Sequence, residues 1–144
     1  MSTVAVTSGL GALPSRFRRE RLLIVGYGDV GQRMARNLLT GPGAQRLRVL
    51  ALTSQAERVG SLRAQGVTPL VGNLDHAATL RRLSGLATRV VHLAPPPGEG
   101  GGGAAWWRDP RTVALARALR LRSLPVSLVY ASTSGVYGDC GGAW

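Results

Sequence analysis

The segment Leu22-Leu23-Ile24-Val25-Gly26-Tyr27-Gly28-Asp29-Val30-Gly31 decides the fold, because an apolar run leads into Gly-x-Gly-x-x-Gly and then into residues with helical spacing. With 20 glycines in the chain, the glycine pattern alone would be compatible with a purely structural turn. Its position between a strand and a helix is typical of a dinucleotide-binding site, where the helix N-terminus presents free N–H groups to phosphates. In such a site Gly26 permits a tight turn, Gly28 lets the backbone approach a pyrophosphate, and Gly31 allows close strand–helix packing. The predicted contacts are Gly26, Tyr27, Gly28, Asp29, Val30 and Gly31.

The length and composition predict one domain, since a chain of 144 residues can bury enough apolar surface to fold without disulfides or a structural metal. The single cysteine, Cys140, has no metal-ligand spacing to another residue, so we expect no disulfide, no metal and a reducing compartment, the cytoplasm. No apolar run approaches the roughly 18 residues of a membrane span, so we expect no membrane association. Residues 1–20, which combine glycine, proline and arginine, predict a flexible basic leader before a domain over residues 21–144.

The formal charge of +11 raises the question of nucleic-acid binding. All 18 basic residues are arginines, and outside the leader they are scattered along the predicted helices. Scattered arginines are typical of solvated helix faces, and we therefore expect no nucleic-acid partner.

Short apolar runs alternate with helical segments along the chain. Strands are predicted at residues 22–25, 47–52, 68–71, 89–93 and 126–131, and helices at 30–39, 56–65, 77–83 and 111–122. This alternation requires parallel strands joined by crossover helices, which predicts an α/β fold with a doubly wound sheet.

Turn and cap residues agree with these boundaries. Residues 54–57, Ser-Gln-Ala-Glu, predict a capping box, Gly66 and Gly85 predict helix ends, and Asp109 before Pro110 predicts an N-cap. The Pro- and Gly-rich residues 95–103 predict a loop. For the neighbouring Trp106 and Trp107, packing against the domain is favoured over stacking on a ligand.

Four blocks of sequence resemble the short-chain dehydrogenase/reductase superfamily, in its extended and atypical NAD(P)-dependent epimerase/dehydratase branches. The blocks are Gly26 to Gly31, Val71-Gly72-Asn73-Leu74-Asp75, Val90-Val91-His92-Leu93-Ala94, and Tyr130-Ala131-Ser132-Thr133-Ser134-Gly135-Val136-Tyr137-Gly138. The resemblance begins near Arg21, corresponds to the N-terminal part of that family, and implies a Rossmann sheet with strand order 3-2-1-4-5 that is truncated at its C-terminal side.

In that family the hydroxyl four residues before the tyrosine of the Val-Tyr-Gly element binds the reacting oxygen of the substrate, which implies a catalytic role for Thr133. A hydroxyl at the end of the fifth strand would stand over the cofactor cleft. The alternative is that residues 132–134 satisfy backbone groups in a turn.

The resemblance also implies the remaining cofactor contacts. Asn73 takes the position of an aspartate that reaches the adenine amino group, Leu74 packs on the adenine, and Ala94 and Pro95 line the path to the nicotinamide ribose. At the end of the second strand, Thr53, Ser54 and Arg58 replace the acidic residue that binds ribose hydroxyls, so NADP is slightly preferred over NAD. Ser54 as a helix cap and Arg58 as a solvated residue remain equal alternatives.

The family's Tyr-x-x-x-Lys unit is missing, and the chain contains no lysine. We therefore expect these residues to be the NAD(P)-binding portion of an oxidoreductase acting on a nucleotide sugar or a small hydroxy/keto compound, inactive as this fragment. Loss of a positioned acid–base group costs about 10²- to 10⁴-fold in rate. The alternative is a non-catalytic NADP(H)-binding sensor. An uncovered apolar sheet edge at residues 126–129 predicts self-association.

Overall fold

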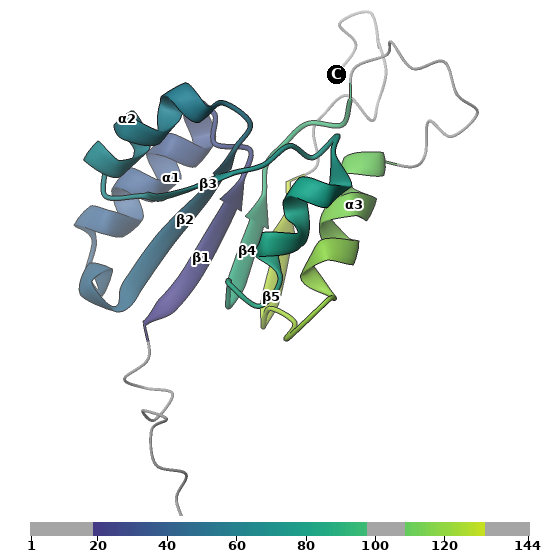
Figure 1. The fold of residues 1–144 in the computed structure, drawn as a ribbon. Coiled ribbons are helices and arrows are strands. Elements are labelled where there is room, and N and C mark those ends of the chain that lie inside the picture. Colours follow the sequence, from purple (N-terminus) through teal and green to yellow (C-terminus); the bar gives the residue numbers. More distant parts are fainter. Residues whose placement is uncertain (1–18, 98–108, 132–144) are drawn as a thin grey trace, which may run out of the picture.

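Five parallel strands form the centre of the computed structural model, which describes residues 19–97 and 109–131 (Figure 1). The strands are β1 (Glu20–Val25), β2 (Leu47–Thr53), β3 (Thr68–Val71), β4 (Arg89–His92) and β5 (Ser127–Tyr130). They lie in the order β3-β2-β1-β4-β5, and every neighbouring pair is parallel. The predicted doubly wound sheet and its strand order are confirmed.

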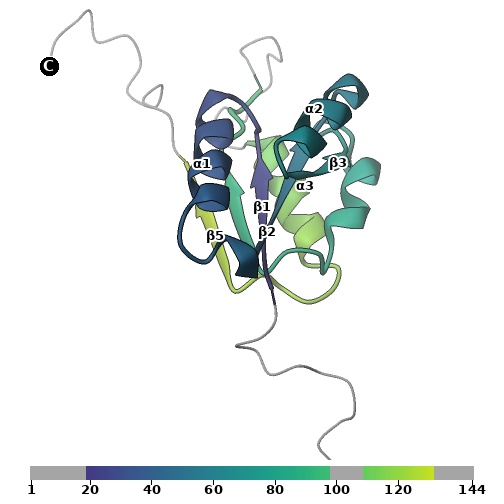
Figure 2. The same cartoon turned by 90° about the vertical axis from the view of Figure 1, so that its left-hand side faces the viewer.

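Helices cover both faces of the sheet. The α-helices are α1 (Asp29–Thr40), α2 (Val59–Ala64) and α3 (Pro110–Leu119), and the 3₁₀-helices are η2 (Ala44–Arg46), η3 (Ala56–Arg58) and η4 (Ala77–Leu83). The helices α1 and α2 pack on one face, and η4 and α3 pack on the other (Figures 1 and 2). The sheet is therefore a middle layer between two helical layers.

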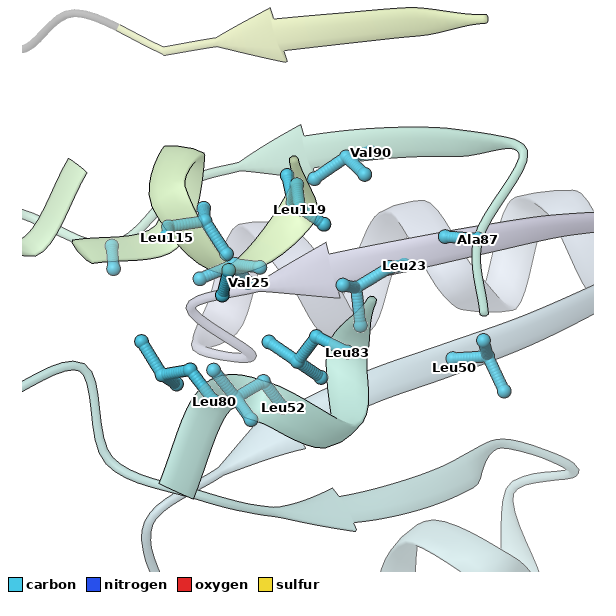
Figure 3. Packing of buried hydrophobic residues seen from close by; sticks show 12 residues of the cluster. Leu23, Val25, Leu50, Leu52, Leu80, Leu83, Ala87, Val90, Leu115 and Leu119 are labelled. Atoms are coloured by element: carbon cyan, nitrogen blue, oxygen red, sulfur yellow. The ribbon is translucent and has the colours of Figure 1, made fainter. Parts of the chain in front are cut away.

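The strands alternate their side chains between two apolar cores, as the period of two along a strand requires. In β1, Leu23 and Val25 join the core under η4 and α3, whereas Leu22 and Ile24 join the core under α1 and α2. Figure 3 shows the first core, in which residues from β1, β2 and β4 meet leucines of η4 and α3. Burial on both faces explains why the strand sequences are continuously apolar.

Two of the three cap predictions are confirmed and one is wrong. The Asp109 carboxylate accepts the N–H of Arg111 at 3.0 Å, and Gly66 and Gly85 adopt φ values of +79° and +73° beyond helix ends. The capping box at residues 54–57 does not form, because Gln55 and not Ser54 takes the position before the helix, and the Thr53 hydroxyl accepts the Gln55 N–H at 3.1 Å. The predicted helix 56–65 accordingly divides into η3 and α2, with Gln55 before η3 and no side-chain cap.

The strand β5 lies at the edge of the sheet and pairs with β4 alone among the described residues. Around it, Val126, Leu128 and Val129 are 84%, 48% and 57% exposed. An apolar edge at residues 126–129 was predicted from the sequence, and this part of that prediction agrees with the structure.

The buried core predicts a clear contrast between two leucines. Leu115 of α3 is almost fully buried, and Leu124 before β5 is two-thirds exposed. We expect Leu115→Ala to lower the free energy of unfolding by about 2–5 kcal/mol, because it leaves a cavity. Leu124→Ala should change it by less than about 0.5 kcal/mol. Urea denaturation measures both, and equal losses would contradict the packing described.

Candidate functional site

A groove of about 400 Å³ lies at the carboxyl ends of β1, β2, β3 and β4. Residues after each of these strands, together with Arg111 from the first turn of α3, form its walls. The chain continues from β1 to β2 on one side and from β4 to β5 on the other, so strand order reverses between β1 and β4. In open α/β sheets, ligands bind at this switch point.

The groove brings together most of the predicted cofactor contacts. Its lining includes Gly26, Tyr27, Gly28, Thr53, Ser54, Arg58, Asn73, Leu74, Ala94 and Pro95. Asp29, Val30 and Gly31 form the first turn of α1 beside the groove and do not line it. Thr133, Trp106 and Trp107 lie outside the described residues.

The three glycines of the motif have different surroundings. Gly26 has φ +89°, and a Cβ there would lie 2.4 Å from the backbone nitrogen of Ala94. At Gly31 a Cβ would lie 3.1 Å from the carbonyl oxygen of Gly26, so this glycine allows α1 to approach β1. A Cβ at Gly28 would meet no atom within 4 Å of the described chain. Packing therefore explains Gly26 and Gly31, whereas Gly28 borders open groove.

The N-terminus of α1 begins at the same place. Gly28 precedes the helix without a side-chain cap, and its carbonyl accepts the first helical hydrogen bond from Gln32 at 2.9 Å. The N–H groups of Asp29, Val30 and Gly31 consequently have no acceptor within the helix. The Asp29 carboxylate pairs with Arg33 at 3.1 Å on the exposed side. This turn offers a group of N–H donors of the kind that binds phosphate.

The end of β2 supplies a cation and no carboxylate to the groove. The hydroxyl of Thr53 is occupied by the backbone of Gln55, whereas the Ser54 side chain is exposed and bonds to no described residue. Arg58 donates from Nη2 to the carbonyl oxygen of Tyr27 at 3.0 Å and lies 6.0 Å from the centroid of the Tyr27 ring. Arg58 is thus held at the groove wall, unlike a freely solvated helix residue.

Tyr27 contributes to the groove while its side chain is buried. The ring packs in the core under α1 and α2, and its hydroxyl donates to Gln65 Oε1 at 3.0 Å. Burial raises the pKa of Tyr27, with Arg58 and Arg36 acting in the opposite direction. Its hydroxyl therefore anchors the glycine turn to the end of α2.

The residues after β3 form a turn stabilised by their own side chains. Asn73 Oδ1 accepts the N–H of Asp75 at 2.9 Å, and the Thr79 hydroxyl accepts the N–H of Asn73 at 2.9 Å. A carbonyl oxygen has a second acceptor lone pair and the Asn73 side chain also has an NH₂ group, so it retains hydrogen-bonding capacity toward the groove.

Sequence reasoning missed two charged groove residues, Asp75 and Arg111. Arg111 donates from Nε and Nη2 to the two carboxylate oxygens of Asp75, each at 2.8 Å. This pairing lowers the pKa of Asp75. The partners are 36 positions apart, so no local pattern links them, although Asp75 belongs to a block already singled out. Also missed were Leu52, Gln55, Gly72 and Leu93.

A buried histidine lies behind this wall. His92, 1% exposed, places Nε2 at 2.9 Å from the Thr112 hydroxyl, which donates to the Asp109 carboxylate. Its Nδ1 is buried and has no hydrogen-bond partner among the described residues. Burial lowers the pKa of His92, and the charge of Asp109 offsets part of this effect.

The fold, the glycine turn and the groove at the switch point define a Rossmann-type nucleotide-binding domain. The family model described as the TrkA-N domain matches residues 22–94, about half of the chain. The chain belongs to this family of Rossmann-type NAD-binding domains.

Solved structures with similar folds include reductases and a putative epimerase. A putative epimerase from Burkholderia cenocepacia has a TM-score of 0.60 and 21% identity, with 88% of this chain and 41% of that chain covered. A short-chain dehydrogenase/reductase from Veillonella parvula has a TM-score of 0.58 and 17% identity, covering 84% and 50%. An NADPH-dependent quinone oxidoreductase from Escherichia coli has a TM-score of 0.55 and 21% identity, covering 77% and 36%.

The chain thus spans half or less of the length of these three structures. Their likeness establishes the fold, in agreement with the resemblance seen in the sequence. Comparison with the curated proteins gave no match.

Two further features concern the part of the chain that the structure describes. None of its helices has the length and apolar character needed to cross a membrane. It also contains no group of three or more His, Cys, Asp or Glu side chains arranged to hold a metal ion.

The buried His92 predicts a pH-dependent stability. The pKa of His92 in the folded chain lies below the usual 6.5. At a pH between the folded pKa and 6.5, the unfolded chain therefore binds a proton that the folded chain does not. The contribution of His92 is therefore fully present above pH 6.5 and is lost as the pH falls below it. Urea denaturation from pH 7.5 to about 5 should show falling stability, and His92→Gln should flatten this slope. The exposed His76 gives the control variant His76→Gln, and an equal flattening there would contradict the assignment.

Proposed function

We propose that this chain is the NAD(P)-binding portion of an epimerase/dehydratase-type oxidoreductase that acts on a nucleotide sugar or a small hydroxy/keto compound. The observation that carries the proposal is Gly28, where a Cβ would point into open groove beside the free N–H groups of α1. Protein packing does not require a glycine there, whereas the close approach of a pyrophosphate does.

The remaining groove residues fit the two ends of a dinucleotide. In the proposed complex the first turn of α1 binds the pyrophosphate, and Asn73 and Leu74 contact the adenine. Ala94 and Pro95 border the nicotinamide ribose on the other side of the turn. A bound cofactor would supply hydride transfer, while the protein orients it. The quinone oxidoreductase with the similar fold was solved in complex with NADPH, which supports a dinucleotide as the ligand.

Replacing Gly28 tests the proposed site directly. We expect Gly28→Val to weaken NADPH binding by about a hundredfold or more, because its side chain fills the space that the pyrophosphate needs. Tryptophan-to-cofactor energy transfer or isothermal titration measures the affinity. Gly60→Ala provides the control, since Gly60 lies on α2, does not line the groove and has open space around its Cβ position. Unchanged affinity in Gly28→Val would contradict the site.

We further propose that Arg58 favours NADP over NAD. Its guanidinium uses one N–H for the Tyr27 carbonyl and retains others for a 2′-phosphate. No carboxylate from β2 or η3 lines this part of the groove. The 2′-phosphate would therefore meet no negative charge from these two elements.

We expect Arg58→Met to weaken NADPH binding about tenfold while changing NADH binding less than about twofold. Parallel titrations with the two cofactors measure the ratio, and Arg63→Met, an exposed position of α2 outside the groove, is the control. Equal losses for both cofactors would show that Arg58 acts through the Tyr27 loop and not on the 2′-phosphate.

In the proposed reaction, the Thr133 hydroxyl binds the substrate oxygen. The residue follows β5, and the carboxyl end of β4 next to β5 borders the groove. The sequence contains no lysine, so proton transfer by a Tyr-x-x-x-Lys unit would need residues that these 144 do not include. We therefore propose catalytic turnover only for a longer protein that contains these 144 residues.

A second candidate function is an NADP(H)-binding sensor without turnover, which the cofactor contacts proposed for the groove support equally. A sensor would bind cofactor without oxidising or reducing it and would change its affinity for a partner. The exposed residues of β5 offer a surface for self-association in either case. Because these 144 residues are expected to lack turnover under both functions, the separating assay uses the protein from its native source. This protein is incubated with cofactor and candidate hydroxy and keto compounds, and the reaction is followed at the absorbance of the reduced nicotinamide.

A further inference from the structure

Arg111 joins three separate parts of the groove wall. Besides its two bonds to the Asp75 carboxylate, it donates from Nη1 to the carbonyl oxygen of Pro95 at 3.2 Å. Asp75 follows β3, Pro95 follows β4, and Arg111 lies in the first turn of α3. All three residues line the groove. We call Asp75, Arg111 and Pro95 the Arg111 brace.

The base of the brace is fixed. Pro110 occupies the first turn of α3, and the backbone N–H of Arg111 donates to the capping carboxylate of Asp109 at 3.0 Å. The guanidinium is planar and presents its donors in a rigid fork, so three bonds to two loops define its position. A displacement of the loop after β3 relative to the loop after β4 would break at least one of these bonds.

The brace differs from the other ion pairs of the described residues. The pairs Arg33–Asp29 and Arg89–Glu20 make single contacts of 3.1 and 3.3 Å between side chains that are more than half exposed. In the brace the Arg111 and Asp75 side chains are 26% and 46% exposed, and both carboxylate oxygens accept. Bidentate geometry of this kind is stronger and more directional than a simple surface pair.

The brace also reaches the proposed adenine contact. Asp75 is held by Arg111 through its carboxylate, and its backbone N–H donates to Asn73 Oδ1. Arg111 therefore orients the Asn73 side chain through Asp75. On the other side, its bond to Pro95 fixes the residue next to Ala94.

We propose that Arg111 is a positioning residue for the dinucleotide. It holds the loop after β3, which carries the proposed adenine contacts, at a fixed separation from the loop after β4, which borders the proposed place of the nicotinamide ribose. The proposal rests on the proposed function of the groove. In this proposal Arg111 does not contact a phosphate, because the Asp75 carboxylate already neutralises the charge of Arg111. Preorganised loops reduce the ordering cost of binding, and this reduction is the contribution of the brace.

Titration with NADPH and with 2′,5′-ADP, which contains the adenosine half alone, tests the proposal. We expect Arg111→Met to weaken both ligands by about three- to tenfold. Asp75→Asn should weaken them similarly, and the double variant should be no weaker than either single one, because both act through one contact. Arg111→Lys should fail to restore affinity, since an ammonium cannot make the three bonds.

Arg89→Met is the matched control, because the Arg89–Glu20 pair lies at the opposite, amino-terminal edge of β4 and β1. It should leave both affinities unchanged. Wild-type affinity in Arg111→Met would overturn the positioning role while leaving the proposed function intact. Tighter binding in Asp75→Asn would also overturn it, because this result would make Arg111 a phosphate ligand that Asp75 restrains.

Amide hydrogen exchange without ligand provides the second readout. Residues 72–76, together with Leu93 and Ala94 just before the three prolines, should exchange faster in Arg111→Met than in the wild-type chain and in Arg89→Met. Unchanged exchange would overturn the proposal even if binding weakened. If the wild-type chain bound neither NADPH nor 2′,5′-ADP, the proposed function would be overturned. The proposed role of Arg111 toward the cofactor would then be overturned as well.

Discussion

The close approach of Gly26 to Ala94 is the constraint on which the rest of the structure depends. The N–H of Leu93 donates to the carbonyl oxygen of Val25 at 2.7 Å, which extends the ladder between β1 and β4 beyond the end of β4 and brings Ala94 over Gly26. A side chain at position 26 would collide with this backbone. Because the chain turns here without a Cβ, α1 begins three residues later and packs across β1. The same turn leaves open groove between the loops after β1 and β4.

The sheet supplies a rigid platform for that groove. The middle strands are buried on both faces, and their side chains alternate between two separate cores. Such strands have little freedom to shift, because a slip by one residue would exchange the two cores. The loops at the carboxyl edge can therefore differ in sequence without disturbing the sheet. This independence of the loops from the sheet explains how the fold is shared with two reductases and a putative epimerase that are 21% identical or less.

Much of this arrangement could be predicted from the sequence, because it depends on local chemistry. The strand order follows from the alternation of elements and a family resemblance, and the cap at Asp109 follows from a carboxylate preceding a proline. The capping box at residues 54–57 was wrong because Gln55 and not Ser54 precedes η3, and the hydroxyl that bonds the backbone at this turn is that of Thr53. The contact of Arg111 with Asp75 could not be predicted, since it depends on how α3 packs beside the loop after β3.

The electrostatics of the groove give a physical reason for one orientation of an anionic dinucleotide. The chain has a charge of +11, yet the two arginines of the described residues that line the groove are not equivalent. Arg111 is neutralised by Asp75, whereas Arg58 bonds a backbone carbonyl and keeps its full charge. Positive potential in the groove is therefore concentrated at the end of β2 and at the N-terminus of α1. In the proposed complex, the 2′-phosphate and the pyrophosphate would occupy these two places, and the nicotinamide ribose, which adds no negative charge, would lie toward Ala94 and Pro95.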